Sequence, residues 1–257
     1  MPPVFSTAGV SDVGRIRSRN EDAYAVESTL GLAVVADGMG GHPAGDVASA
    51  LAVQELTAVF RDPSTEEHRL NGQEHELGQV GVRMAEAVER ANDRILAEAE
   101  ADPSRAGMGT TLTALRVSAS TGGFALAHVG DSRAYVFSSG RLRQLTKDHT
   151  WVQEMVDAGK LSLDVGETHP LRHILSRALG IGRPVAPEII NGHGSPGDLF
   201  LLCTDGLAGM IPDHEIEGYL RGNLGDDLDG LARGLVALAN ENGGSDNITV
   251  VLLRLAE

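Results

Sequence analysis

Short apolar runs that end at glycine, aspartate or asparagine are the feature that most limits how this chain can fold. Such runs lie at Val4 to Val10, Leu32 to Ala36, Leu199 to Thr204 and Ile248 to Leu253. Their length and their content of valine, leucine and isoleucine are typical of strands. A further group of three runs between Thr111 and Phe137 has the spacing of a hairpin series, which indicates antiparallel pairing.

Helical periodicity separates these strands in two places. Ala48, Ala52 and Leu56 would share one helix face, and the stripe that contains Leu228 and Leu235 predicts a late helix. The order is strands, helices, strands, helices and a last strand, which disfavours a doubly wound parallel sheet. We therefore expect an α+β fold of antiparallel sheets flanked by helices, formed by one domain over residues 1–257.

Charge and composition exclude several classes of partner. The formal net charge is −15 and no Lys/Arg cluster offsets it, so the chain should repel nucleic acid and anionic membranes. The sequence has neither a membrane-spanning run of about 18 apolar residues nor a secretion signal. The sole cysteine, Cys203, lies in an apolar run and has no intramolecular disulfide partner. These features favour a reducing, cytoplasmic location.

Acidic residues recur at the ends of the strand-like runs. Asp37, Asp131 and Asp205 each follow one, and a glycine follows Asp37 and Asp205. A strand end holds a side chain at the rim of a sheet, and glycine allows the backbone to approach a ligand. Carboxylate and carbonyl oxygens suit Mg²⁺ or Mn²⁺. Any one Asp-Gly could be a turn, but the repetition predicts a metal site.

Five segments, taken in their order along the chain, make the acidic pattern specific to one protein family. They resemble the motifs of the metal-dependent serine/threonine protein phosphatases of type 2C, and three further segments resemble the bacterial branch of that family. The resemblance covers nearly the whole chain. The five segments are Ser11 to Asp22, Val34 to His42, Gly130 to Arg133, Leu202 to Leu207 and Ser245 to Thr249.

The resemblance implies a fold and a set of metal ligands. The fold would be a four-layer α-β-β-α sandwich of two antiparallel sheets flanked by helices, with two core Mn²⁺ or Mg²⁺ ions and a third, weaker one at one edge. Asp37 would bridge the two core ions. The other implied ligands are Asp205 and Asp246 on the first ion, Glu21 and the Gly38 carbonyl on the second, and Asp131 with Asp205 on the third.

The resemblance also implies a reaction. A water that bridges the two ions would attack phosphoserine or phosphothreonine directly, without a phosphoenzyme. Asp22 would order water at the metals, and Arg17 would hold the substrate phosphate with a planar guanidinium. The partners would then be phosphorylated proteins, the targets of a serine/threonine kinase. A surface segment at about residues 159–187, rich in Gly, Pro, His and Arg, would form a flap beside the cleft.

Each of these roles has a plainer alternative. Arg17 could be an ordinary exposed arginine, and Asp131 could be a turn carboxylate that pairs with Arg133. The fold could also be a regulatory module that only captures a partner, although every expected ligand is present. A metal-dependent hydrolase of a small phosphoester would need the same metal ligands, and only the flap and Arg17 favour a phosphoprotein.

Other phosphatase and hydrolase mechanisms find no support. The Cys-x₅-Arg loop of thiolate phosphatases would need an arginine six residues after Cys203, where Gly209 stands. A P-loop and the His-Glu-x-x-His motif of zinc proteases are both absent from the sequence.

The position of His42 in the sequence leads to a testable prediction about its role in catalysis. In the eukaryotic branch of the family a histidine directly follows the Asp-Gly, whereas Met39 stands there in this chain and His42 comes three residues later. His42 could protonate the leaving oxygen, or it could be a loop or helix-cap residue.

If His42 is the proton donor, His42→Gln should slow phosphoserine peptide hydrolysis by a large part of the roughly 10²- to 10⁴-fold typical of general acids. Hydrolysis of p-nitrophenyl phosphate should slow much less, because its leaving group is already a weak base. The measurement is kcat for both substrates at saturating metal. Equal losses on both would assign His42 to shaping the loop, and no loss would make it a bystander.

Overall fold

Two antiparallel sheets make up the centre of the structure, a computed structural model that describes residues 5–40, 44–61, 73–162, 165–166, 169–225 and 227–256, with residues 73–77 as backbone only. The strands of the first sheet are β1 (Phe5–Asp12), β7 (Arg133–Ser138), β8 (Arg141–Gln144), β10 (Leu199–Cys203) and β11 (Ile248–Leu255). They lie in the order β1-β11-β10-β7-β8.

The second sheet has the order β2-β3-β5-β6-β9, and β4 pairs with the end of β3. Its strands are β2 (Asp22–Glu27), β3 (Leu32–Met39), β4 (Gly109–Thr110), β5 (Leu112–Val117), β6 (Gly123–Val129) and β9 (Glu188–His193). Every neighbouring pair in both sheets runs antiparallel, as the hairpin spacing in the sequence predicts.

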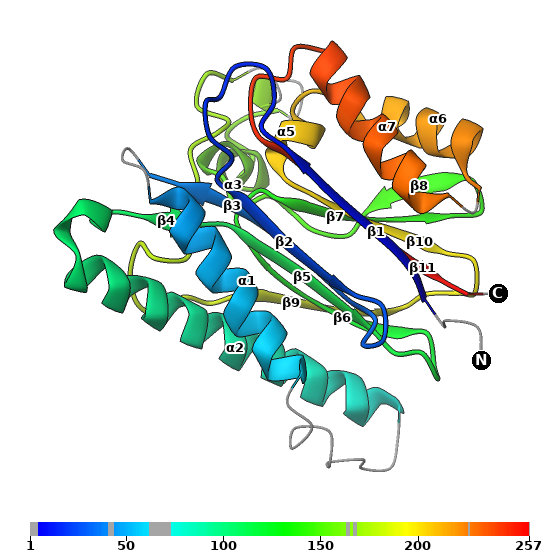
Figure 1. Cartoon of the computed structure of the whole chain (residues 1–257), viewed down its shortest axis with the longest axis horizontal. Coiled ribbons are helices and arrows are strands. Elements are labelled where there is room, and N and C mark those ends of the chain that lie inside the picture. The colour runs from blue at the N-terminus through cyan, green and yellow to red at the C-terminus, as the bar shows by residue number, and fades with distance from the viewer. Residues whose placement is uncertain are drawn as a thin grey trace.

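Helices cover the outer face of each sheet (Figure 1). The second sheet is covered by α1 (Gly45–Arg61) and α2 (Gln73–Ala101), and the first by α6 (Asp213–Asn223) and α7 (Leu228–Glu241). Three short helices complete the described residues: α3 (Trp151–Asp157), α5 (Asp205–Ala208) and the 3₁₀ helix η2 (Pro103–Arg105). None of the helices in the described part of the chain is both long and apolar enough to cross a membrane.

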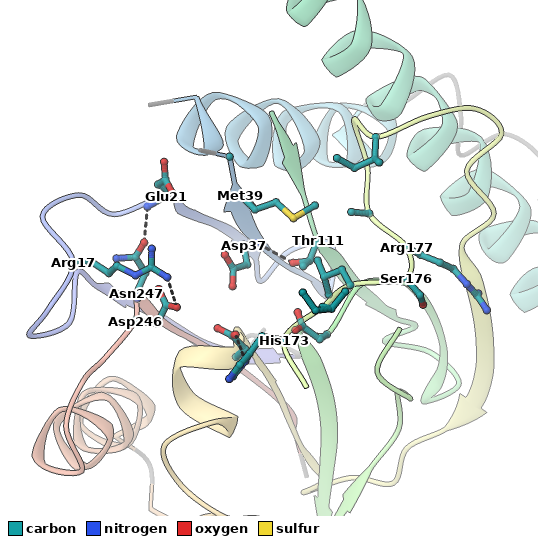
Figure 2. A pocket seen from close by; sticks show the side chains of 18 of the residues that line it. Arg17, Glu21, Asp37, Met39, Thr111, His173, Ser176, Arg177, Asp246 and Asn247 are labelled. Atoms are coloured by element: carbon teal, nitrogen blue, oxygen red, sulfur yellow. Dashed lines mark hydrogen bonds and ion pairs between the residues drawn. The ribbon is translucent and has the colours of Figure 1, made fainter. Parts of the chain in front are cut away.

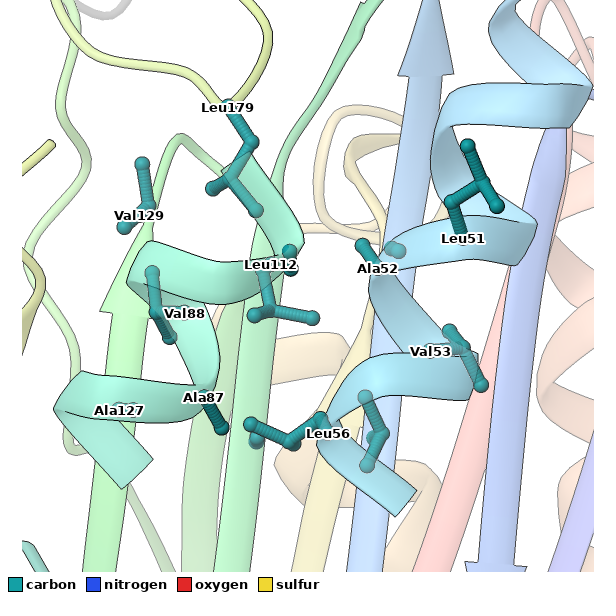
Figure 3. Packing of buried hydrophobic residues seen from close by; sticks show 14 of the residues in the cluster. Leu51, Ala52, Val53, Leu56, Ala87, Val88, Leu112, Ala127, Val129 and Leu179 are labelled. Carbon is teal, nitrogen blue, oxygen red and sulfur yellow. The ribbon is translucent and has the colours of Figure 1, made fainter. Parts of the chain in front are cut away.

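The central strands are buried on both faces, which explains their uninterrupted apolar sequences. On β3, Val34 packs into the cluster beneath α1 and α2, and Val35 packs between the sheets. On β10, Leu201 faces the α6 and α7 side, and Phe200 faces the other sheet. Figure 3 shows the first of these clusters, where side chains of α1 and α2 meet those of the strands. The expected four-layer α-β-β-α sandwich is confirmed.

The segment between α3 and β9 lacks long regular elements in its described residues and is held to the body by isolated backbone pairs. Thr150 pairs with Leu175, and Thr110 pairs with Leu179. Leu179 is fully buried and belongs to the cluster beneath α1 and α2. The described residues of the segment expected as a flap, at about 159–187, are therefore anchored at Thr110 on β4 and at Thr150 before α3.

Candidate active site

A pocket of about 800 Å³ gathers residues from distant parts of the chain at one end of the two sheets (Figure 2). Seven of the predicted site residues line it: Arg17, Glu21, Asp37, Gly38, Asp131, Asp205 and Asp246. Asp22 lies behind this lining, and His42 lies outside the described residues. The order of the strands thus brings together residues more than 200 positions apart.

The sheet register explains why the carboxylates converge. Asp37 is near the end of β3, and Asp22 stands opposite it at the start of β2. In the other sheet, Asp205 comes two residues after β10 ends, and Asp246 comes two residues before β11 begins. Since β10 and β11 are antiparallel neighbours, the end of one lies beside the start of the other. Each carboxylate therefore stands at the rim of its sheet, at the same end of the sandwich.

Asp22 joins the two sheets at the level of the pocket. Its Oδ2 accepts hydrogen bonds from Thr204 Oγ1 (2.9 Å) and Thr249 Oγ1 (2.6 Å). Thr204 directly follows β10 and Thr249 lies on β11, so both donors come from the first sheet. Its Oδ1 is buried without a hydrogen-bond partner. Burial and, to a lesser extent, the charges of Asp205 and Asp246 raise the pKa of Asp22 to about 7, although the two threonines favour the carboxylate.

Asn247 fixes the loop that carries Arg17, a role that the sequence did not reveal. Its Oδ1 accepts the Glu21 backbone N–H (2.8 Å), and its Nδ2 donates to the backbone oxygens of Val13 (3.0 Å) and Arg19 (2.8 Å). One buried amide therefore satisfies three backbone groups of the segment around Arg17. The sequence signal for this role is that Asn247 directly follows the candidate ligand Asp246, and it does not identify the backbone groups that Asn247 contacts.

Gly38 is required by a close approach between β3 and the start of α1. A Cβ at this position would lie 2.1 Å from the Gly45 carbonyl oxygen and 2.5 Å from that of Glu21, so no larger residue fits. The Gly38 N–H donates to the same Glu21 oxygen (3.1 Å), which also accepts from Ser49 Oγ (2.6 Å). These bonds hold the backbone of Glu21 and Gly38 together at the pocket wall.

Arg17 forms an ion pair with Asp246, with 2.7 Å between Nη2 and Oδ2. Its side chain is 52% exposed, so the guanidinium is open to the pocket mouth as well as to this carboxylate. The Asp246 hydrogen bond is the largest cause of a raised Arg17 pKa, and Asp37 and Asp205 contribute through their charges. Arg17 is thus a fixed positive charge at the edge of an acidic pocket.

The carboxylates raise one another's pKa values. Burial is the largest cause at Asp37, whose pKa lies well above its ordinary value, and Asp205 is the largest of the neighbouring charges. Burial and the charge of Asp205 likewise raise the pKa of Asp131 to about 8. The pKa of Asp205 is raised by burial and by Asp246, and that of Glu21 by burial and by Asp46. A site of this kind favours protons or cations.

The donor set fits hard divalent cations. All candidate ligands are oxygens, which Mg²⁺ and Mn²⁺ prefer, and Asp205 Oδ1 is buried without a hydrogen-bond partner. Among the described residues, no group of three or more His, Cys, Asp or Glu side chains is already arranged to hold an ion. Mutual repulsion of the carboxylates opposes such an arrangement until a positive charge is present.

Asp131 lines the pocket instead of pairing with its neighbour Arg133. Arg133 forms a two-pronged ion pair with Asp148, with Nε at 2.9 Å from Oδ1 and Nη2 at 2.8 Å from Oδ2. The alternative in which Asp131 serves as the partner of Arg133 is therefore not what the structure contains.

The segment expected as a flap lines the pocket with residues between His173 and Ile181. Of these, Ser176 and Arg177 belong to a segment that resembles the bacterial branch of the family, whereas His173 was not singled out from the sequence. Figure 2 shows Arg17 and Asp246 on one side of Asp37, and Ser176 and Arg177 on the other. His173 approaches Asp205, with 3.9 Å between Nδ1 and Oδ2. No periodicity marks these positions in the sequence, because only the anchoring of the flap brings them to the pocket.

Comparison with known proteins gives consistent matches over the chain. The family model described as protein phosphatase 2C matches residues 15–224. The serine/threonine phosphatase stp of Listeria monocytogenes serovar 1/2a is 37% identical over 246 residues, which are 95% of this chain and 93% of that protein. Mycobacterium tuberculosis PstP is 37% identical over 97% of this chain, but the chain spans only 45% of its length.

Solved structures agree with these matches. The Mycobacterium tuberculosis phosphatase PstP/Ppp has a TM-score of 0.87 and 37% identity, covering 99% of this chain and all of the solved one. A structure of the catalytic domain of PstP in complex with two manganese ions has a TM-score of 0.81 and 34% identity, covering 99% of both chains.

The raised carboxyl pKa values predict that, without metal, the folded protein becomes less stable as pH rises. Between about pH 4 and pH 8, the folded state keeps protons on Asp22 and Asp131 that the unfolded chain has lost. The free energy of unfolding in EDTA should therefore fall by several kcal/mol as pH rises through this range, since each pKa unit corresponds to roughly 1.4 kcal/mol. Asp37→Asn should flatten the fall, because it removes a third carboxyl group whose own pKa is raised by burial.

Urea unfolding in EDTA at pH 5, 6, 7 and 8 measures this slope. Glu89→Gln, a change at an exposed position of α2, is the matched control and should keep the wild-type slope. A wild-type stability that is constant or rises with pH would contradict the electrostatic argument.

Proposed function

The chain belongs to the protein phosphatase 2C family, and we propose that it hydrolyses phosphoserine and phosphothreonine in other proteins with the help of Mn²⁺ or Mg²⁺. The observation that carries the proposal is the gathering of five carboxylates with Arg17 in a single pocket, which Arg177 also lines. The relatives named serine/threonine phosphatase and the two manganese ions bound to the PstP catalytic domain support it. The catalytic domain would comprise residues 1–257.

The ligand roles expected from the sequence suit the positions of the residues. Asp37 is central and would serve both core ions, with Asp205 and Asp246 on one side and Glu21 with the Gly38 carbonyl on the other. Asp131, which lines the same pocket, would share a weaker ion with Asp205. When bound, the ions would stabilise the attacking and leaving oxygens and lower the pKa of a water between them.

The chain's own residues would orient the phosphate and the water. Arg17 can offer a planar pair of N–H groups to two phosphate oxygens while Asp246 fixes its direction. Asp22 Oδ1 has no partner in the structure and is free to accept a hydrogen bond from a water molecule, while its Oδ2 is held by two threonines. Asp22 would thus position a water molecule through Oδ1 while the two threonines fix the orientation of its side chain.

The partners and location are proposed from the same features. A phosphoprotein substrate implies an opposing serine/threonine kinase, and the buried, unpaired Cys203 suits the reducing cytoplasm. A module that only captures a phosphoprotein would have no need for a complete set of carboxylates. A small phosphoester substrate would make no use of a flap that lines one side of the pocket.

Activity should require added metal. Turnover of a phosphothreonine peptide should appear with Mn²⁺ and cease in excess EDTA, because hard cations exchange readily from hydrated oxygen sites. Asp205→Asn should lower kcat by at least about 10²-fold and weaken Mn²⁺ binding measured by calorimetry, since it removes a ligand charge. Glu89→Gln serves as the control for both readouts. Full turnover in EDTA would falsify the metal mechanism.

Arg17→Ala should separate phosphate binding from metal binding. The loss of a charged hydrogen bond of about 1.5 to 3 kcal/mol predicts a drop of roughly ten- to a hundredfold in kcat/KM. Mn²⁺ affinity should not fall, because removing Arg17 leaves the Asp246 carboxylate more available to the cation. Steady-state kinetics and calorimetry give the two numbers. If Mn²⁺ affinity collapses instead, Arg17 acts by holding Asp246 in place.

A further inference from the structure

The flap side of the pocket has an apolar wall that the hydrolysis of phosphate does not use. Met39, Ile174, Leu175 and Ile181 line the same pocket as Asp37 and Asp205. Ile174 is 53% exposed and Ile181 is 61% exposed, which is unusual for isoleucine in a folded domain. Apolar surface that stays in water beside a binding site marks a place where a partner can cover it.

Two of these side chains meet over a glycine. A Cβ on Gly109 would lie 3.0 Å from Ile181 Cδ1 and 3.1 Å from Met39 Cε, so the glycine leaves room for both ends to come together. Met39 is the second residue after Asp37 on β3. The apolar wall therefore begins directly beside the carboxylate at the centre of the pocket, and Figure 2 shows Met39 on the flap side of Asp37.

Ile174 lines the same pocket as Asp205 and follows His173, whose Nδ1 lies 3.9 Å from Asp205 Oδ2. On β3, Met39 lines the pocket two residues after Asp37. Adjacent residues of an extended peptide have Cα atoms only about 3.8 Å apart. The residue next to a phosphoresidue bound at the carboxylates would therefore remain inside this pocket, within reach of the apolar wall.

The backbone that carries the wall is fixed, so its shape is set before a substrate binds. The Ile174 carbonyl accepts the Trp151 N–H (2.8 Å) at the start of α3. On both sides of Ile181 the buried Asn92 of α2 makes a clamp, with Oδ1 accepting from Gly180 N (2.8 Å) and Nδ2 donating to Gly182 O (3.0 Å). A rigid apolar wall can discriminate between side chains, whereas a loose one would adapt to each.

We propose that this wall, formed by Met39, Ile174 and Ile181, selects phosphoprotein segments in which an apolar residue stands immediately before or after the phosphorylated residue. The inference rests on the proposed function, because the phosphate fixes where the neighbouring residue lies. Burial of an aliphatic side chain against the wall would favour such substrates. A neighbouring aspartate or glutamate would instead place its charge against apolar side chains, in a pocket whose five carboxylates outnumber its two arginines, Arg17 and Arg177.

Phosphothreonine peptides that differ only at the two flanking positions test the selection. With Mn²⁺ present, peptides with leucine at one flanking position should show a kcat/KM roughly five- to fiftyfold above that of the peptide with serine at both. Ile174→Ser and Ile181→Ser should bring this ratio toward one. Both positions are more than half exposed, so these changes remove no core packing.

Val82→Ser is the matched control, because Val82 is 59% exposed on α2 and does not line the pocket. It should keep the wild-type ratio. Equal kcat/KM for the leucine and serine peptides, or an unchanged ratio in both isoleucine variants, would overturn the selection while leaving the phosphatase intact. Absence of Mn²⁺-dependent turnover of every peptide would overturn the proposed function itself, and the selection with it.

Discussion

Repulsion between carboxylates at one end of the two sheets is the constraint on which the site depends. Burial and mutual charge raise the pKa values of Asp37, Asp131 and Asp205, so keeping these groups together costs free energy when they are ionised. The surrounding structure offsets this repulsion with Arg17, which pairs with Asp246, and with neutral hydrogen-bond donors. Thr204 and Thr249 hold Asp22, and Asn247 holds the backbone at Glu21. The negative charge of the pocket is thereby retained for a cation.

The four-layer arrangement makes this possible because it separates the site from the core. Each central strand buries both faces, so the position of its end is fixed by packing on two sides. Side chains at those ends can then be polar and can repel one another without disrupting the packing of the sheets. Asp22 couples the layers directly, since it stands on β2 and accepts hydrogen bonds from Thr204, directly after β10, and Thr249, on β11 of the first sheet.

Much of this arrangement was predictable because it repeats a local pattern. The buried strands have uninterrupted apolar sequences, and their terminal aspartates marked the pocket before its geometry was known. The elements that were missed carry weak patterns: β8 and β9 are edge strands with polar residues, and α6 buries only Ile216 and Leu220. The role of Asn247 was not predictable, since its bonds to Val13 and Arg19 span more than 220 residues and follow only from the register of the folded chain.

The flap shows how a segment without periodicity can still have a defined shape. Its order comes from contacts with parts of the chain that do have periodicity: Leu179 is buried beneath α1 and α2, and Asn92 of α2 holds the backbone around Ile181. Because these anchors are buried, the flap can expose isoleucines at the pocket without relying on them for stability. Residues that face the substrate can then change in sequence while the anchors and the carboxylates stay the same. This separation allows one catalytic pocket to be combined with different substrate preferences.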